Sequence, residues 1–176
     1  ASPRTKQKIP TIGFLYNVAA FKGVDIALEA IAKVKQRIPA LKVICFGSHP
    51  PPNNEILPSY VELHIEPPQE RIKDLYSACD AWVTCSRSEG FNLPAMEAMA
   101  CRTPVVSTKT GWPAEAIRTK YNGFLADVND TNAIADGIEY ILNTSETEWA
   151  TLSNNAYKTV ENSSWEKSSK LFESSL

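Results

Sequence analysis

Two carboxylates, Glu89 and Glu97, stand eight positions apart in the stretch "SRSEGFNLPAMEAMA" (residues 86–100). Asn92 is a good helix N-cap and Pro94 suits a first helical turn, so the stretch predicts a helix start. Glu97 is the only charged residue in the apolar run that follows Asn92. A carboxylate buried there without a partner would cost several kcal/mol. We therefore expect Glu97 either to meet a hydrogen-bond donor or to reach solvent.

The backbone amides from Gly90 to Leu93 add a second kind of partner to this helix start. The first N–H groups of a helix have no acceptor within the helix, and the helix dipole makes them attractive to anions such as phosphate. Gly90 lets the backbone approach such a ligand closely. Acids beside these amides would compete with phosphate unless they face hydroxyl groups, which sugars supply. The residues favour a diphosphate that carries hydroxyl-bearing groups, and a capped helix without a ligand is the alternative.

A junction of this kind needs a parallel sheet, because ligands collect where parallel strands end and helices begin. Strand-like runs alternate with helical periodicity along the chain, which is typical of a sheet covered by helices on both faces. We predict an α/β, Rossmann-like three-layer sandwich with a parallel sheet of about six strands. The predicted strands are residues 11–17, 41–48, 61–66, 80–86, 103–108 and 123–128. The predicted helices are residues 24–39, 68–79, 93–101, 112–119 and 130–143, with two more after Thr144.

Composition bounds the class of protein. The chain has 176 residues, with 18 Lys plus Arg against 20 Asp plus Glu, so no basic face is offered to a nucleic acid. Its four cysteines lack CxxC spacing and its two histidines are isolated, so we expect a reduced, cytoplasmic compartment and no metal site. No apolar run reaches the length of a membrane span. The first ten residues are polar with two prolines, which predicts a linker over 1–10 and one domain over 11–176.

The segment "SEGFNLPAMEAMACRTPVVST" (residues 88–108) resembles the signature of the retaining glycosyltransferases of GT-B type, family four, in which seven residues separate two glutamates. Other segments are similar to that family's first helix with its lysine, to the helix and strand before the signature, and to the elements after it: residues 21–39, 75–86, 122–142 and 163–169. The likeness covers nearly the whole chain. It implies the C-terminal, donor-binding half of an enzyme that transfers a hexosyl group from a nucleotide diphosphate sugar.

The resemblance gives each site residue a role. Glu89 would approach the donor sugar near its reacting centre, and Lys22 would neutralise phosphate charge as the sugar is transferred. Glu97 would bind the ribose hydroxyls. The diphosphate would lie on the amides of Gly90, Phe91, Asn92 and Leu93. The resemblance implies no cofactor and no metal.

The sequence departs from the family pattern at two of these positions. Asn17 stands where the family usually has an arginine for the diphosphate, and a neutral amide binds a diphosphate less tightly than a guanidinium. Arg87 is a candidate to replace that charge; a solvated loop arginine is the alternative. Asn92 stands where the family often has glycine, which is a mild change because asparagine tolerates unusual backbone angles.

The base pocket and one aromatic residue are interpreted through the same resemblance. The base would lie between the loops that follow the second and third strands, near Ser48, with Gly47 and Pro67 beside it. Turn chemistry alone also explains these residue types. Trp112 stands where the family commonly has glycine, and ordinary packing is a better interpretation than stacking on a ligand.

In the resembled family a second, N-terminal domain holds the acceptor, and we expect that domain to be absent from this chain. The ligand would be a UDP-, GDP- or ADP-linked sugar, and the acceptor a sugar or lipid. The full-length protein would be a hexosyltransferase in the cytoplasm or at the cytoplasmic face of a membrane, whereas this chain alone would bind donor and transfer sugar very poorly.

Other functions fit the same architecture. A noncatalytic nucleotide-sugar-binding scaffold with a decayed site is the main alternative, and Asn17 is the feature in its favour. A phosphorylase or sugar-nucleotide epimerase is a further alternative. A dehydrogenase is disfavoured, because no GxGxxG motif follows the first predicted strand.

Overall fold

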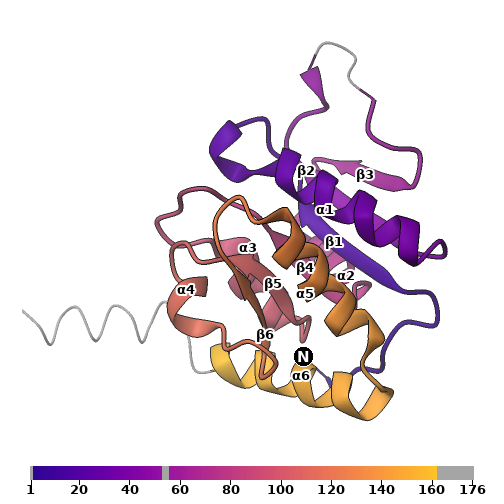
Figure 1. Cartoon of the computed structure of the whole chain (residues 1–176), viewed down its shortest axis with the longest axis vertical. Coiled ribbons are helices and arrows are strands. Elements are labelled where there is room, and N and C mark those ends of the chain that lie inside the picture. Colours follow the sequence, from indigo (N-terminus) through magenta and orange to yellow (C-terminus); the bar gives the residue numbers. More distant parts are fainter. Residues whose placement is uncertain (1, 53–55, 162–176) are drawn as a thin grey trace, which may run out of the picture.

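A computed structural model describes residues 2–52 and 56–161 of the chain (Figure 1). Its centre is a sheet of six parallel strands in the order β3-β2-β1-β4-β5-β6. The strands are β1 (Thr11–Leu15), β2 (Lys42–Gly47), β3 (Val61–Ile65), β4 (Ala81–Thr84), β5 (Val105–Thr108) and β6 (Gly123–Ala126). Each lies within a predicted strand range, and the predicted Rossmann-like α/β architecture is confirmed.

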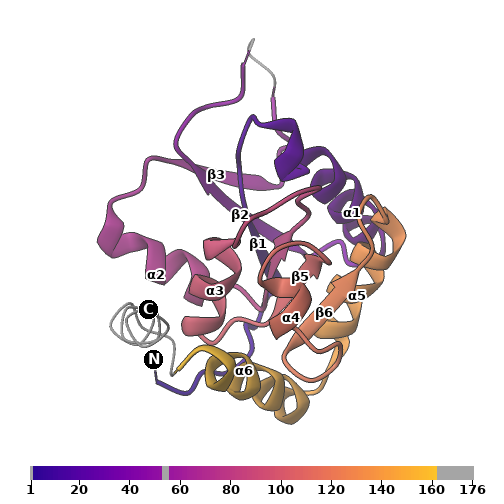
Figure 2. The same ribbon diagram turned by 90° about the vertical axis from the view of Figure 1, so that its left-hand side faces the viewer.

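Helices cover both faces of this sheet (Figure 2). One face carries α1 (Val24–Arg37) and α5 (Thr131–Asn143), which pack against each other, and the other carries α2 (Gln69–Ser77) and α3 (Leu93–Ala100). The remaining elements are the 3-10 turn η1 (Ala20–Lys22), the single turn α4 (Pro113–Ala116) and α6 (Glu146–Val160). None of the helices over residues 2–52 and 56–161 is long and apolar enough to cross a membrane. The last predicted helix, around Trp165, lies outside the described residues.

The strand order places the candidate site. β1, β2, β4 and β5 are buried almost throughout because helices cover both of their faces, whereas the edge strand β3 is half-buried or exposed along its length. The chain moves outward from β1 to β3 in one direction and from β4 to β6 in the other. Ligands of doubly wound sheets bind at the carboxyl ends of the two strands where the order reverses. Those strands are β1 and β4, and their loops carry the predicted site.

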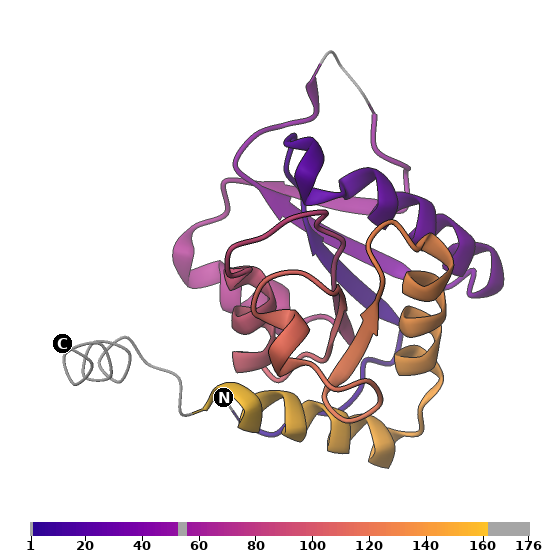
Figure 3. The ribbon, with the colours of Figure 1, turned by 60° about the vertical axis from the view of Figure 1, so that its left-hand side comes forward.

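Residues 2–10, expected to form a linker, are bound to the domain. The guanidinium of Arg4 donates to the main-chain carbonyls of Cys79 and Cys101, each at 3.0 Å. It also lies 5.5 Å from the ring centroid of Trp149 in α6, and the start of the chain runs beside α6 in Figure 3. The linker prediction was based on polar composition, which does not reveal contacts with residues far along the chain.

We expect Arg4→Ala to lower the free energy of unfolding by about 2–3 kcal/mol, because it leaves partly buried carbonyls without their charged donor. For a chain of this size the Tm should fall by about 4–12 °C. Urea and thermal unfolding measure both quantities. Arg71→Ala is the matched control. The side chain of Arg71 is 63% exposed on α2, and its Nε lies 3.8 Å from Oδ2 of Asp74. Equal losses in the two variants would contradict an anchoring role for Arg4.

Candidate functional site

The loops after β1, β2 and β4 bring the predicted site residues to the carboxyl edge of the sheet. Lys22 lies in η1 after β1, Ser48 directly follows β2, and Glu89 lies in the loop between β4 and α3. Glu97 lies in α3, the helix into which that loop leads. These segments are distant in the sequence, and the parallel sheet aligns them because all of its strands end at the same edge.

Lys22 and Glu89, the two residues predicted to act in catalysis, form an ion pair. Lys22 Nζ lies 2.6 Å from Glu89 Oε1, and the side chains are 23% and 9% exposed. The hydroxyl of Ser86 donates to the same carboxylate oxygen at 2.8 Å. The carboxylate therefore has a fixed position, and a cation that could face phosphate stands beside it.

A close approach between two loops fixes Lys22 in this position. Gly23 has φ 65°, and a Cβ atom there would lie 2.0 Å from the carbonyl oxygen of Cys85 at the end of β4. Only glycine allows the β1 loop to lie this close to β4. The amide of Arg87 donates to the carbonyl of Phe21 at 2.7 Å, which joins the same two loops again.

The four amides predicted to hold a diphosphate are free. The N–H groups of Gly90, Phe91, Asn92 and Leu93 have no acceptor in the part of the chain that the structure describes. Gly90 is exposed, its φ lies outside the left-handed region, and a Cβ added to it would meet no protein atom within 4 Å. Space is therefore open in front of these amides, at the positive end of the α3 dipole.

Asn92 occupies the N-cap position of α3, but its side chain does not cap the helix. The residue is left-handed, with φ 75°, and makes no side-chain cap hydrogen bond. The helix therefore begins at Asn92 as expected, but without a capping hydrogen bond from its side chain. Asparagine suits the position because it tolerates a left-handed backbone. Its Nδ2 is buried without a hydrogen-bond partner among the described residues. It lines a pocket of about 20 Å³ with Thr84, Ser86 and Glu89, which is room for one water molecule.

Glu97 both reaches solvent and meets a donor, so neither sequence alternative is complete by itself. Its side chain is exposed, and its Oε2 accepts a hydrogen bond from the hydroxyl of Tyr76 in α2 at 2.8 Å. Burial, followed by the nearby charge of Glu97, raises the pKa of Tyr76 far above its ordinary value. Tyr76 therefore stays protonated as the donor of this bond.

Asn17 carries no charge, and the charge of Arg87 is paired with a carboxylate. The side-chain oxygen of Asn17 accepts from the amide of Ala19 at 2.8 Å, so it is used within its own turn. Arg87 binds both carboxylate oxygens of Asp25, at 3.0 and 2.6 Å, and Asn129 Oδ1 at 2.9 Å. This hydrogen bonding holds the pKa of Asp25 below its usual range. The charge of Arg87 is therefore paired with that of Asp25 in this structure, and its replacement of the missing arginine stays a prediction.

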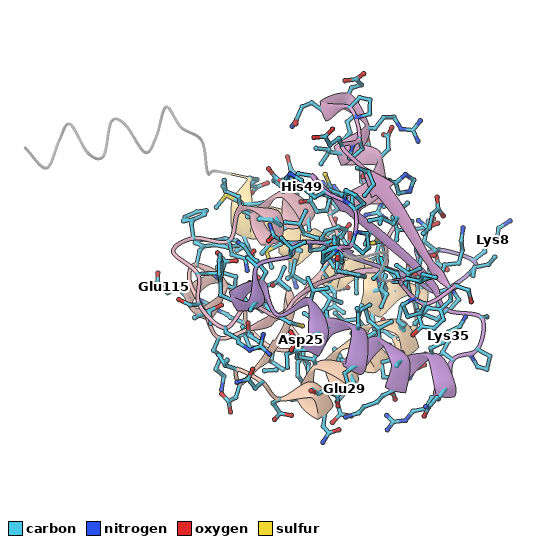
Figure 4. The ribbon with its side chains drawn as sticks, turned by 90° about the horizontal axis from the view of Figure 1, so that it is seen from above. Lys8, Asp25, Glu29, Lys35, His49 and Glu115 are labelled. Carbon is cyan, nitrogen blue, oxygen red and sulfur yellow. The ribbon has the colours of Figure 1, made fainter. Side chains whose placement is uncertain are left out.

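Two further predicted residues, Ser48 and Trp112, contact their own neighbours. Ser48 is exposed, and its hydroxyl lies 2.8 Å from Nδ1 of His49. Figure 4 shows His49 well away from Lys8, which precedes β1 at the amino edge. Trp112 stacks on Phe91 with ring centroids 5.9 Å apart and an interplanar angle of 23°, in agreement with the expected packing role.

Three residues of the site were not predicted from the sequence. Ser86 stands three positions before Glu89, a spacing at which a hydroxyl reaches a carboxylate in a turn, so a local signal was present. Tyr76 lies in the predicted helix over residues 68–79, 21 positions before Glu97, and no spacing pattern links the two residues. Asp25 lies 62 positions from Arg87, and no local pattern reveals that pair.

The family model "Glycosyl transferases group 1" matches residues 1–159. An uncharacterized glycosyltransferase of Methanocaldococcus jannaschii is 33% identical over 150 residues, covering 83% of this chain and 42% of that protein. This chain therefore spans less than half the length of that relative.

Two crystal structures show the same fold. The C-terminal domain of a glycosyl transferase group 1 family protein from Francisella tularensis has a TM-score of 0.75 and 26% identity, over 88% of this chain and 87% of that one. Anabaena HepE in complex with UDP-glucose has a TM-score of 0.74 and 23% identity, over 88% of this chain and 44% of that one. From its sequence and its fold, the chain belongs to the glycosyl transferases group 1 family and has the fold of the C-terminal GT-B domain.

Proposed function

We propose that this chain is the donor-binding domain of a retaining glycosyltransferase that transfers a hexosyl group from a nucleotide diphosphate sugar to an acceptor. The observation that carries the proposal is the Lys22–Glu89 ion pair at 2.6 Å, directly before the free amides of residues 90–93. A cation, free amides and a fixed carboxylate match the three parts of a sugar diphosphate: the phosphate charge, the phosphate oxygens and the sugar hydroxyls.

This arrangement suits cleavage of the bond between the sugar carbon and the phosphate oxygen. Negative charge grows on the departing diphosphate as that bond breaks, and Lys22 with the free amides would stabilise it without reorganisation. Glu89 would hold the sugar near its reacting centre. The acceptor oxygen forms the new bond on the same face of the sugar, and its proton passes to the leaving diphosphate. The proposal assigns no metal or cofactor, because the lysine and the amides supply the positive charge.

The nucleoside would extend from the diphosphate toward α2. Glu97 would accept hydrogen bonds from the ribose, and Ser48, after β2, would lie near the base. Asn17 would contribute a neutral contact at most, so binding of the diphosphate should depend on Lys22. The noncatalytic alternative is not favoured, because the Lys22–Glu89 pair is intact.

We further propose that the remainder of a longer protein supplies the acceptor site. The chain spans 42% of the M. jannaschii relative, so contacts to an acceptor sugar or lipid would come from another domain. This chain alone would bind donor and transfer sugar very poorly. The longer enzyme would act in the cytoplasm or at the cytoplasmic face of a membrane. Since HepE was crystallised with UDP-glucose, UDP is the first nucleotide to test beside GDP and ADP.

Thermal unfolding of the chain with UDP, GDP, ADP and their hexose conjugates tests the proposal. A ligand at a hundred times its Kd adds about 2.7 kcal/mol of stability, which raises the Tm by about 5–10 °C for a chain of this size. Gly90→Ala should keep the Tm of the free chain, because its Cβ meets no protein atom within 4 Å, and should lose most of the ligand response. If no nucleotide raises the Tm of the wild-type chain, the proposed function is wrong.

A further inference from the structure

We propose that Tyr76 is a positioning residue, which holds the carboxylate of Glu97 in place to select a ligand with ribose hydroxyl groups. The inference rests on the proposed function, since it concerns the nucleoside part of the same ligand. Tyr76, in α2, would contact no ligand itself and would act through Glu97.

The hydrogen bond between these residues leaves half of the carboxylate available. The Tyr76 hydroxyl donates to Oε2 of Glu97 at 2.8 Å, and Tyr76 is 1% exposed. Glu97 is exposed, and its Oε1 has no hydrogen-bond partner in the part of the chain that the structure describes. One oxygen is therefore attached to the interior of the domain, while the other is open to a ligand.

The core fixes the position of the tyrosine hydroxyl. The ring of Tyr76 packs edge-on against Trp82 with centroids 4.4 Å apart, and against Phe46 with centroids 5.5 Å apart. Trp82 is fully buried, so the tyrosine ring cannot turn away without opening the core. Glu97 has a long flexible side chain on the surface, and alone it would sample several rotamers. The bond to Tyr76 therefore restricts the Glu97 side chain to fewer rotamers than it would sample alone.

The bond also has a fixed direction. Tyr76 keeps its proton because burial and the charge of Glu97 both oppose its ionisation. The carboxylate is therefore always the acceptor toward Tyr76, and its free oxygen is an acceptor toward the ligand. A pair of neighbouring hydroxyl groups, as on a ribose, is the kind of donor that such an oxygen recognises.

This arrangement predicts selection against nucleotides without ribose hydroxyls. A site built to accept a hydrogen bond from a ligand discriminates against an analogue that lacks the donor, because a polar group covered by the bound ligand then stays unpaired. A carboxylate that moved freely would turn to water and discriminate less. The contribution of the ribose hydroxyls to affinity is therefore the property that depends on Tyr76.

The experiment measures the Kd values of UDP, GDP and ADP and of their 2′,3′-dideoxy analogues by calorimetry, with the whole chain and its variants. For the base that binds, we expect the wild-type chain to prefer the ribonucleotide by about tenfold or more. Tyr76→Phe retains the ring and removes only the hydroxyl. It should reduce that preference to about threefold or less and leave the Kd of the dideoxy analogue unchanged.

Two further variants show whether Tyr76 acts through Glu97. Glu97→Gln should reduce the same preference, and the double variant should lose no more than Glu97→Gln alone, because the two residues form one unit. Tyr140→Phe is the control: Tyr140 packs against Phe124 away from α3, and its variant should keep the wild-type preference.

The possible outcomes separate the inference from the function on which it depends. Tyr76→Phe with an unchanged preference would show that Tyr76 serves only packing, while the proposed function would stand. An equal loss of affinity for both kinds of nucleotide would also overturn the positioning role. Failure of the wild-type chain to bind any of the ribonucleotides would overturn the proposed function and this inference with it.

Discussion

Lys22→Met is expected to weaken the binding of a nucleoside diphosphate roughly 30- to 150-fold, because it removes a charge-assisted hydrogen bond worth about 2–3 kcal/mol. Methionine keeps much of the length of the lysine side chain without its charge. In a longer protein that holds the acceptor, transfer should fall at least as much, since negative charge on the diphosphate grows during the reaction. Calorimetry with UDP, GDP and ADP measures the first effect.

The large loss of affinity expected for Lys22→Met follows from the contacts of the neighbouring polar side chains. Asn17 is neutral and accepts from its own turn, and Arg87 is bound to both oxygens of Asp25. Asn17 has no charge to replace that of Lys22, and the charge of Arg87 is already paired with that of Asp25. In a domain with a second cation at the diphosphate, the same substitution would have a smaller effect.

Glu89→Gln separates charge neutralisation from sugar contact. In the structure Lys22 is bound to Glu89 at 2.6 Å, so a diphosphate competes with this carboxylate for the lysine. Glutamine is a weaker competitor, and we therefore expect the affinity for the diphosphate to stay equal or to rise while any contribution of the sugar to binding is lost. Only the lysine variant should therefore lose affinity for the diphosphate.

Lys42→Met is the charge control for this series. Lys42 is exposed at the amino end of β2, at the opposite edge of the sheet, and its variant has the same net charge as Lys22→Met. If both lysine variants weaken binding equally, the effect is one of overall charge and the role given to Lys22 is wrong.

The fold could be predicted from the sequence because its signals are local. A continuous apolar run such as the one in β2 marks a strand buried on both faces, and the spacing of apolar residues in α1 marks an amphipathic helix. The alternation of such elements is enough to indicate a parallel sheet. The single turn α4 was predicted longer than it is, because periodicity over a few residues does not define where a helix ends.

The site was predictable only where its signal was local or family-based. The free amides before α3 follow from the position of the helix start. The resemblance singled out Lys22 and Glu89 but did not predict that they form an ion pair. The bond of Tyr76 to Glu97 joins residues 21 positions apart, and no pattern of spacing predicts it. Arg4 was assigned to a linker because its segment is polar with two prolines. Two of its partners are main-chain carbonyl groups, which no sequence pattern identifies.

Gly23→Ala is expected to lower the free energy of unfolding by about 3–5 kcal/mol, because two costs combine at this position. The residue has φ 65°, which strains any residue with a Cβ atom, and the added atom would lie 2.0 Å from the backbone oxygen of Cys85. A backbone atom cannot rotate away as the end of a side chain can, so the β1 loop must move. Because Lys22 is the preceding residue, the variant should also lose its response to nucleotides. Urea unfolding with and without ligand measures both effects.

Two other glycines separate the contributions of strain and contact at Gly23. Gly90→Ala adds neither, since its φ is ordinary and its Cβ meets nothing within 4 Å, so it should unfold like the wild-type chain. Gly111→Ala adds left-handed strain at φ 56° with nearest contacts of 3.1 Å, and should lose about 1–2 kcal/mol. If Gly111→Ala is as unstable as Gly23→Ala, the closer backbone contact at Gly23 adds no measurable cost. A graded series would instead show that the contact of the β1 loop with the carbonyl oxygen of Cys85 adds a cost of its own to the backbone strain.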